Sequence, residues 1–144
     1  MQRINLFPTT GFLNGISGSA EHTVANGEMT VKPGERNVFS AVIVHDVGRD
    51  ELVLSVEVKG SWNVLVFDSD RHLLASTGES HNVSDWTVKT IRFTPSPGKG
   101  LIIGFYPVGG ELIVRRPQLE LASTFDSGVG GGYPRFFTAQ NAPY

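Results

Sequence analysis

The stretch Glu51–Lys59 reads ELVLSVEVK and holds the clearest strand pattern of the chain. Successive side chains of a β-strand point to opposite faces. The pattern therefore predicts a half-buried strand, with Leu52, Leu54, Val56 and Val58 on one face and Ser55, Glu57 and Lys59 on the other. The segment Trp62–Phe67 follows after Gly60-Ser61 and is predicted to form a second strand.

Short strand patterns recur on both sides of this segment. Asn26-Gly27 lies between His22–Ala25 and Glu28–Val31, which predicts a two-residue hairpin. Val108–Gly110 is predicted to turn a further hairpin, and a change of apolar parity predicts a β-bulge near Lys89-Thr90. The other predicted strands are Val38–Val44, Arg71–Ala75, Trp86–Thr94, Leu101–Tyr106 and Glu111–Val114. About eight to ten short strands at this spacing are typical of a β-sandwich or barrel.

The composition limits the classes of function. The chain has 144 residues, enough for one domain, and its 17 glycines and 8 prolines imply frequent turns. A net charge of −2 without a basic block argues against a nucleic-acid partner, and the lack of cysteine excludes thiolate metal sites. No apolar run approaches the roughly 18 residues of a membrane span, and we expect no membrane partner and no signal peptide. No uninterrupted helical spacing is present, so no helix is predicted.

The two ends of the chain lie outside the strand pattern. We predict an N-terminal arm over residues 1–19, a sandwich over 20–122 and a C-terminal arm over 123–144. Gly128–Gly132 is interpreted as a hinge within the second arm. Unpaired aromatic side chains on a free arm would favour aggregation, so we expect these to contact a surface. The candidate interface residues are Phe7, Phe12, Arg135, Phe136, Phe137 and Tyr144. The sequence leaves open whether that surface belongs to a neighbouring subunit or to the arm's own sandwich.

A series of short motifs resembles, in order, a jelly-roll domain common in bacteriophage minor tail proteins. Asn5-Leu6-Phe7-Pro8 resembles its opening segment, and Val31-Lys32-Pro33-Gly34-Glu35 with Val38-Phe39-Ser40-Ala41 resembles its strand entry. Trp86–Pro97 and Pro117-Gln118-Leu119-Glu120 resemble two later strands. Phe125-Asp126-Ser127-Gly128 and Tyr133–Thr138 resemble the tail that follows, although Phe136 or Phe137 stands where that tail has tryptophan.

The resemblance implies an all-β fold, an antiparallel jelly-roll β-sandwich of the carbohydrate-binding-module or galactose-binding type, with extended arms. It also implies a non-enzymatic virion structural protein, either a minor tail protein or a capsid decoration protein. Its expected partners are other virion proteins, on which it would form a homo-oligomer. Its expected location is the phage particle, after synthesis in the host cytoplasm.

The alternative function is carbohydrate-binding adhesion to host surface glycans. Sugar rings stack on exposed aromatic rings, and the candidates for such stacking are Trp62, Trp86, Tyr106 and Tyr133. Asn63, Asn82, Asp85 and Gln118 are candidate hydrogen-bond partners of the sugar hydroxyls. Each tryptophan could instead fill the core, where large aromatic side chains contribute most. The core is preferred for Trp86, and the two interpretations of Trp62 are evenly balanced.

Catalytic and metal chemistry have weaker signals. None of the four histidines, His22, His45, His72 and His81, lies in a nucleophile or metal motif, and solvated histidines are the preferred interpretation. Asp68-Ser69-Asp70 and Asp126-Ser127-Gly128 are interpreted as Asx turns, with calcium as the less favoured alternative. We therefore predict no enzyme activity, no metal and no cofactor.

Overall fold

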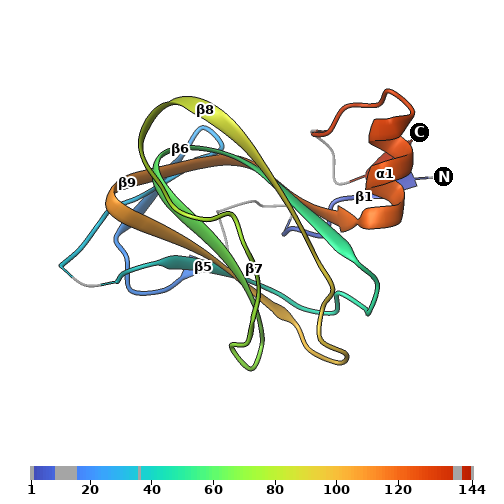
Figure 1. Ribbon diagram of the computed structural model, residues 1–144, viewed down its shortest axis with the longest axis horizontal. Helices are drawn as coiled ribbons and strands as arrows, with labels where there is room; N and C mark the ends of the chain where they lie inside the picture. The colour runs from blue at the N-terminus through green and yellow to red at the C-terminus, as the bar shows by residue number, and fades with distance from the viewer. Residues whose placement is uncertain (1, 9–15, 36, 138–140, 144) are drawn as a thin grey trace.

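A computed structural model describes residues 2–8, 16–35, 37–137 and 141–143 (Figure 1). Its elements are β1 (Gln2–Ile4), β2 (Ile16–Ser17), β3 (His22–Ala25), β4 (Glu28–Val31), β5 (Ser40–Val44), β6 (Leu52–Asp68), β7 (Leu73–Ser76), β8 (Ser80–Phe93), β9 (Leu101–Leu121), α1 (Ala122–Gly130) and β10 (Asn141–Pro143). None of the helices in this part of the chain is long and apolar enough to cross a membrane.

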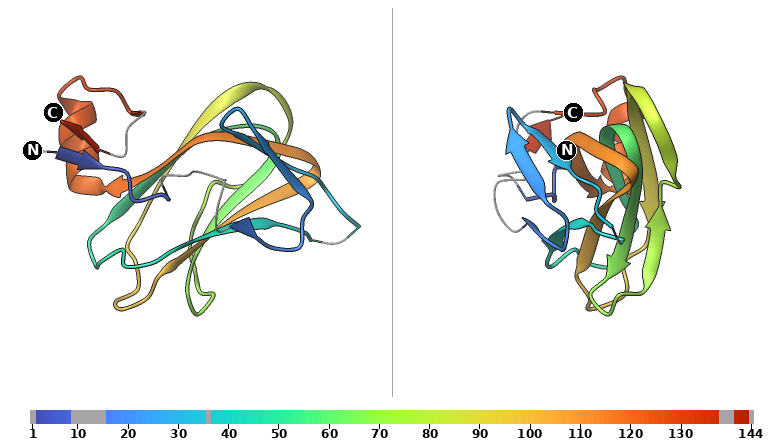
Figure 2. Two further views of the ribbon diagram at one scale, coloured as in Figure 1. Left: turned by 180° about the vertical axis from the view of Figure 1, so that it is seen from behind. Right: turned by 90° about the vertical axis from the view of Figure 1, so that its left-hand side faces the viewer.

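Two long strands, β6 and β9, pair antiparallel along most of their length and run through both layers of a sandwich (Figures 1 and 2). The second half of β6 and the first half of β9 belong to sheet I, whose strand order is β2-β5-β9-β6-β7. The first half of β6 and the second half of β9 belong to sheet II, with the order β3-β4-β9-β6-β8. All of these pairings are antiparallel, so the predicted antiparallel jelly-roll β-sandwich is confirmed.

The passage between the two sheets lies at a corner that β6 and β9 share. From Gly60 to Trp62, two steps along β6 are matched by five steps along β9, from Leu112 to Pro107. Gly60 has a φ of +88°, and a Cβ at this position would overlap the carbonyl oxygen of Glu111. Glycine is therefore required here both by the backbone conformation and by the close approach of β9.

Two sequence predictions fail at this corner. The segments around Gly60-Ser61 form one bent strand instead of two, and Val108–Gly110 turns no hairpin because β9 continues through it. Glycine-rich stretches were interpreted as chain reversals, whereas here they bend paired strands, as glycine and bulges do at the corners of sandwiches. The two-residue hairpin at Asn26-Gly27 is confirmed, with φ values of +54° and +76°.

The core lies between the inner faces of the two sheets. The apolar face predicted for Glu51–Lys59 is buried as expected, and the largest core side chain is Trp62, which is 1% exposed. The other core residues include Phe7, Met29, Val42, Leu52, Leu54, Val56, Val64, Val66, Phe93, Leu101, Ile103, Phe105, Leu112, Val114 and Leu119. The N-terminal segment thus contributes Phe7 to the protein's own core.

The predicted bulge near Lys89-Thr90 is absent from β8. Pairing between β6 and β8 is in constant register from Phe93 to Thr87, and the shifts occur only near Gly60. The change of apolar parity has another cause, because Val88 lies on the outer face of sheet II and is 46% exposed. Val88, an apolar residue on the solvent side of the strand, thus produced the same change of apolar parity that a bulge would produce.

Helix α1 was not predicted, since glycines interrupt its sequence. It is held by packing: Ala122, Phe125 and Val129 form a small cluster with Val53 on the outer side of sheet II. Gly128 is buried in the helix beside Arg3, where a Cβ would stand 2.6 Å from the arginine Cδ. Residues 128–130 thus form the last turn of α1 rather than a hinge, and Asp126 is helical rather than part of an Asx turn. The predicted boundary at residue 122 falls at the first residue of this helix.

A buried ion pair ties the N-terminal strand to the end of β9. Arg3 and Glu120 are each 1% exposed, with 2.6 Å from Arg3 Nη2 to Glu120 Oε1 and 3.0 Å from Nε to Oε2. Thr124 of α1 donates to Glu120 Oε2 at 2.9 Å, and Gln118 donates to Oε1 at 3.0 Å. Such a bidentate, fully hydrogen-bonded pair satisfies charges that could not otherwise be buried.

The same cluster holds the segment that follows α1. Arg3 donates to the carbonyl oxygens of Pro134 and Arg135, and its guanidinium lies 5.0 Å from the ring centroid of Phe137. Gln118 accepts the backbone N–H of Phe137 at 3.2 Å. Strands β1 and β10 pair next to α1, so both ends of the chain lie on the same side of the sandwich (Figure 2).

Replacing Gly60 with alanine is expected to destabilise the fold by more than the about 1–2 kcal/mol that a left-handed residue costs, because the new Cβ also meets the Glu111 carbonyl. Gly109→Ala is the matched control, since Gly109 has a φ of +79° in the same corner and its Cβ would have no neighbour within 4 Å. Urea unfolding measures both. Equal losses for the two variants would contradict the role given to the corner contact.

Glu120→Gln is expected to lower the free energy of unfolding by about 3–5 kcal/mol, because it leaves the Arg3 charge buried without its carboxylate. It should also make the segment after α1 sensitive to protease. Glu21→Gln is the control, because its pair with Lys32 spans 3.9 Å between exposed side chains and is worth at most about 1 kcal/mol. A loss for Glu120→Gln no larger than for Glu21→Gln would show that the buried pair does not hold the two ends.

Candidate functional site

The outer face of sheet I carries rows of mainly apolar side chains. In β5, Val42 and Val44 point into the core, so Ala41 and Ile43 point outward. The pairing of β5, β9 and β6 then aligns three rows across the sheet: Ile43 with Ile102 and Phe67, Ala41 with Gly104 and Leu65, and Tyr106 with Asn63.

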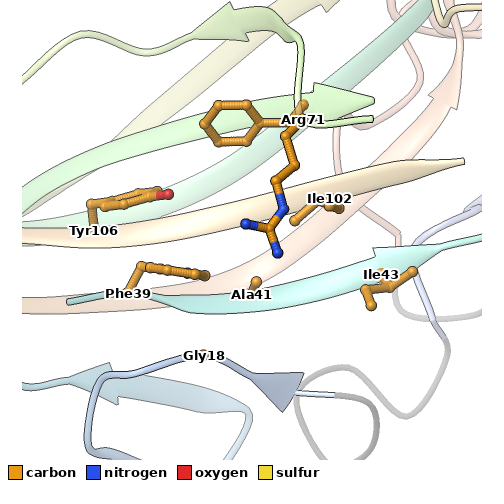
Figure 3. A pocket seen from close by; sticks show the side chains of 8 residues that line it. Gly18, Phe39, Ala41, Ile43, Arg71, Ile102 and Tyr106 are labelled. Atoms are coloured by element: carbon orange, nitrogen blue, oxygen red, sulfur yellow. The ribbon is translucent and has the colours of Figure 1, made fainter. Parts of the chain in front are cut away.

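These rows form the floor of a groove of about 480 Å³. We call it the aromatic groove; it is lined by Gly18, Phe39, Ala41, Ile43, Phe67, Arg71, Ile102 and Tyr106. Figure 3 shows Tyr106 and Phe39 together at one end and Ile43 at the other, with the Arg71 side chain extending between them. A volume of this size is within the range of small-molecule binding sites, which are mostly apolar with few polar groups.

The position of the Tyr106 ring depends on Gly104. A Cβ at residue 104 would stand 2.7 Å from Tyr106 Cε1, so one edge of the tyrosine ring occupies the space above the glycine. The rings of Phe39 and Tyr106 are stacked, with centroids 5.0 Å apart and an interplanar angle of 24°. The stacked pair forms an apolar end of the groove against which a ligand can pack.

A rigid turn after β6 presents Arg71 to the groove. Asp68 Oδ1 accepts the backbone N–H groups of Asp70 at 2.9 Å and His72 at 3.0 Å, which confirms the predicted Asx turn. Its Oδ2 accepts the Ser96 hydroxyl at 2.8 Å, and the Arg71 N–H donates to the Asp68 carbonyl at 2.9 Å. Arg71 itself has a φ of +67°. The position of Arg71 is therefore fixed through the buried Asp68.

Two groups of this region have shifted pKa values. The hydrogen bonds to Asp68, above all that from the backbone N–H of His72, lower its pKa from 3.8 to about 2 against the effect of burial. Burial raises the pKa of Tyr106, and the nearby charge of Arg71 acts in the opposite direction. Tyr106 thus stays a neutral phenol at neutral pH, and Arg71 is close enough for its field to reach that ring.

The structure separates the four aromatic residues predicted to bind a glycan. Tyr106 lines the aromatic groove, whereas Tyr133 follows α1 near the end of the chain. For Trp62, a glycan-binding position and a core position were equally favoured. Trp62 belongs to the core, since it faces inward at the corner and is buried. The preferred core position for Trp86 is wrong, because Trp86 is half-buried among charged side chains on the outer side of sheet II.

Trp86 lies against two cations. The Arg115 guanidinium carbon is 3.9 Å and the Lys59 Nζ 4.7 Å from its ring centroid. Glu57 accepts from Arg115 at 2.9 Å and from Arg116 at 2.7 Å; burial acts to raise the pKa of Glu57, but these bonds and charges lower it overall. The Trp86 ring is therefore engaged within its own domain.

The predicted polar partners are also scattered. Asn63 lies on the outer face of sheet I beside Tyr106 and accepts the Ser76 hydroxyl at 3.0 Å. The backbone N–H of Asn82 donates to the Ser61 hydroxyl oxygen at 3.0 Å, and Gln118 belongs to the Arg3 cluster. The fourth candidate, Asp85, is exposed on β8.

The candidate interface residues that the structure describes contact their own domain. Arg135 donates to Thr90 of β8 at 2.7 Å, and the Phe136 ring lies 4.7 Å from the Arg116 guanidinium. Phe137 lies against the Arg3 guanidinium, and Phe7 is buried in the core. Phe12 and Tyr144 lie outside the described residues. Contacts of these arms with a neighbouring subunit stay a prediction.

The histidines do not converge on a shared site in the described part of the chain. His22 Nδ1 lies 3.4 Å from the Ser40 hydroxyl, His72 Nδ1 lies 3.2 Å from Asp68 Oδ2, and His81 Nδ1 lies 2.9 Å from the Val108 carbonyl oxygen. Within the same residues, no cluster of three or more histidine and acidic side chains could hold a metal ion.

Sequence reasoning did not find Phe39, Phe67 and Arg71 as groove residues. Phe39 and Phe67 belong to the predicted strands Val38–Val44 and Trp62–Phe67, for which no exposed face was predicted. The sequence did contain a signal for both residues. Side chains two or four residues apart in a strand point to the same face, and both residues stand at that spacing from outward-facing positions. Arg71 had no such signal, since its place depends on the turn at Asp68.

Solved structures show which class of fold this sandwich belongs to. A family 4 carbohydrate-binding module is 12% identical with a TM-score of 0.57, over 78% of this chain and 83% of that chain. A variant of a family 29 carbohydrate-binding module is 13% identical with a TM-score of 0.58, over 84% and 92%. The chain has the jelly-roll β-sandwich fold of these carbohydrate-binding modules. No protein-family model and no curated protein sequence matches it.

One similar structure is viral. The enzymatically active domain of tailspike protein 4 of bacteriophage CBA120 is 12% identical with a TM-score of 0.57, over 82% of this chain but only 21% of that chain. The sandwich therefore corresponds to a fraction of that enzyme. At this identity the likeness is one of fold.

Asp68→Asn is expected to destabilise the protein at pH 7 and to flatten its acid response. The folded-state pKa of about 2 lies below the unfolded value, so the stabilisation is fully present above about pH 4 and is lost as the pH falls through 2. Thermal unfolding between pH 7 and pH 2 should show the two proteins converging at the acid end. Asp85→Asn, on exposed β8, controls for the change of net charge. A gap between Asp68→Asn and wild type that is independent of pH would contradict this assignment.

Proposed function

We propose that this protein is a non-catalytic glycan-binding module that holds its ligand in the aromatic groove. The observation that carries the proposal is the stacked pair of Phe39 and Tyr106 at one end of the groove. The carbohydrate-binding-module fold supports it, and so does the size of the groove. The earlier alternative of glycan adhesion thus becomes the preferred function.

Binding would follow from the shape and chemistry of the groove. One face of a pyranose ring presents aliphatic C–H groups, which lose water favourably against an aromatic ring. The Tyr106 ring and the apolar row of Ile102 and Ile43 offer a continuous surface for successive sugar units. Polar side chains at the rim, Arg71 and Asn63 among them, would pair with exocyclic groups of the sugar.

The absence of catalysis is part of the proposal. The carbohydrate-binding modules similar to this chain match it over most of their length, whereas the tailspike enzyme matches over a small share. The described histidines and carboxylates are occupied by separate structural contacts, such as the turn at Asp68 and the cluster at Glu120. Among the described residues that line the groove, none carries a carboxylate or an imidazole.

As a second proposal, we infer that such a module works in a phage virion, as part of a minor tail or capsid decoration protein. The order of motifs in the sequence and the fold shared with a phage tailspike favour it. Location in the phage particle, contacts with other virion proteins and a homo-oligomer belong to this proposal. In that setting, repeated copies would raise the avidity for a host glycan without a tight single site.

Tyr106→Ala is expected to lower glycan affinity at least about tenfold, as loss of a central aromatic contact commonly does. Affinity electrophoresis in gels containing soluble polysaccharides, neutral and acidic, measures the effect. Tyr106→Phe keeps the ring and should retain most of the affinity. Trp86→Ala removes an aromatic ring from sheet II and should bind as wild type does. Binding that survives Tyr106→Ala but is lost in Trp86→Ala would move the site to the other sheet.

A further inference from the structure

Among the described residues that line the aromatic groove, Arg71 is the one with a charged side chain. It places a positive charge at the groove, although the whole chain has a net charge of −2. Figure 3 shows the Arg71 side chain reaching from its turn into the space between Tyr106 and Ile43. Arg71 is exposed, so a ligand can reach its guanidinium, and a ligand that covers it from water would strengthen the ionic interaction.

The acidic residues next to Arg71 are already engaged. Asp70 pairs with Lys99 at 2.9 Å, and Asp68 is buried in the turn, where it accepts backbone and hydroxyl hydrogen bonds. Among the described residues, no carboxylate lies within ion-pair distance, 4.0 Å, of Arg71. Among these residues its guanidinium thus has no carboxylate partner, and its N–H donors can bind a ligand anion.

The turn also restrains Arg71 before any ligand arrives. Its backbone is fixed by the hydrogen bond to Asp68, and the salt bridge between Asp70 and Lys99 fastens the same turn to the chain between β8 and β9. A donor whose backbone is already ordered loses less entropy on binding. This arrangement suits recognition of a planar anion, which arginine binds through two parallel N–H···O bonds.

We propose that the ligand is an acidic polysaccharide built of hexuronate units, with a uronate carboxylate bound by Arg71 while its sugar ring stacks on Tyr106. This inference rests on the proposed function, because it names the ligand class of the same groove. The carboxylate of a hexuronate in its chair form is attached directly to the ring and extends from the ring edge. A sugar ring packed against Tyr106 can therefore direct this carboxylate from its edge toward Arg71, which extends into the groove between Tyr106 and Ile43.

The experiment compares polygalacturonate with its fully methyl-esterified form, since the two share a backbone and differ in the carboxylate charge. Binding of the whole chain is measured by affinity electrophoresis or titration calorimetry, with neutral cellohexaose and a sulfated galactan as further probes. We expect binding to polygalacturonate that weakens as salt is added and weakens at least about tenfold on esterification.

Arg71→Gln is expected to weaken binding to polygalacturonate by about tenfold to a hundredfold, and Arg71→Lys to restore only part of it, because lysine lacks the planar fork. Lys59→Gln is the matched control; it removes one positive charge from sheet II, where Lys59 lies against Trp86, and should leave binding unchanged. Thermal unfolding of each variant confirms that the fold is kept.

The outcomes separate the two proposals. Equal binding of the charged and esterified polymers, preference for cellohexaose or for the sulfated galactan, or wild-type affinity in Arg71→Gln would overturn the acidic-glycan inference, while loss of binding in Tyr106→Ala would still support a glycan groove. Binding of none of these probes nor of a wider glycan panel would overturn both.

Discussion

The fold depends on the close approach of β6 to β9 at Gly60. A side chain at this position would occupy the place of the Glu111 carbonyl oxygen, so only glycine lets the two strands stay paired while both turn the corner. Because β6 and β9 pair in both sheets, this corner sets the relation of one sheet to the other. It also sets the parity of the strands beyond it, which sends Trp62 into the core and Asn63 to the outer face beside Tyr106.

The two outer faces then acquire different chemistry. On sheet II, the cations Lys59, Arg115 and Arg116 are balanced by Glu57 and by the Trp86 ring, and the segment after α1 covers part of the surface. On sheet I, the described chain leaves the aromatic groove uncovered, with Arg71 as the charged side chain among the described residues that line it. The proposed ligand would gain both apolar contact and a directed ionic bond there.

The buried pair of Arg3 and Glu120 explains why the chain ends are part of this domain. It joins β1, the end of β9, α1 and the segment at Arg135 through one set of hydrogen bonds. The described aromatic residues that were predicted to make subunit contacts thereby have partners within their own chain.

Period-two alternation in Glu51–Lys59, the Asn26-Gly27 turn and the Asx turn at Asp68 were determined by the sequence, because each depends on residues close along the chain. Helix α1 and the bend of β9 were not, since each depends on distant packing, against Val53 and at Gly60 respectively. The same reason separates the site residues. Tyr106 could be named from its sequence, but its partnership with Phe39 and Arg71 required the tertiary structure, which brings three segments of the chain to one face of sheet I.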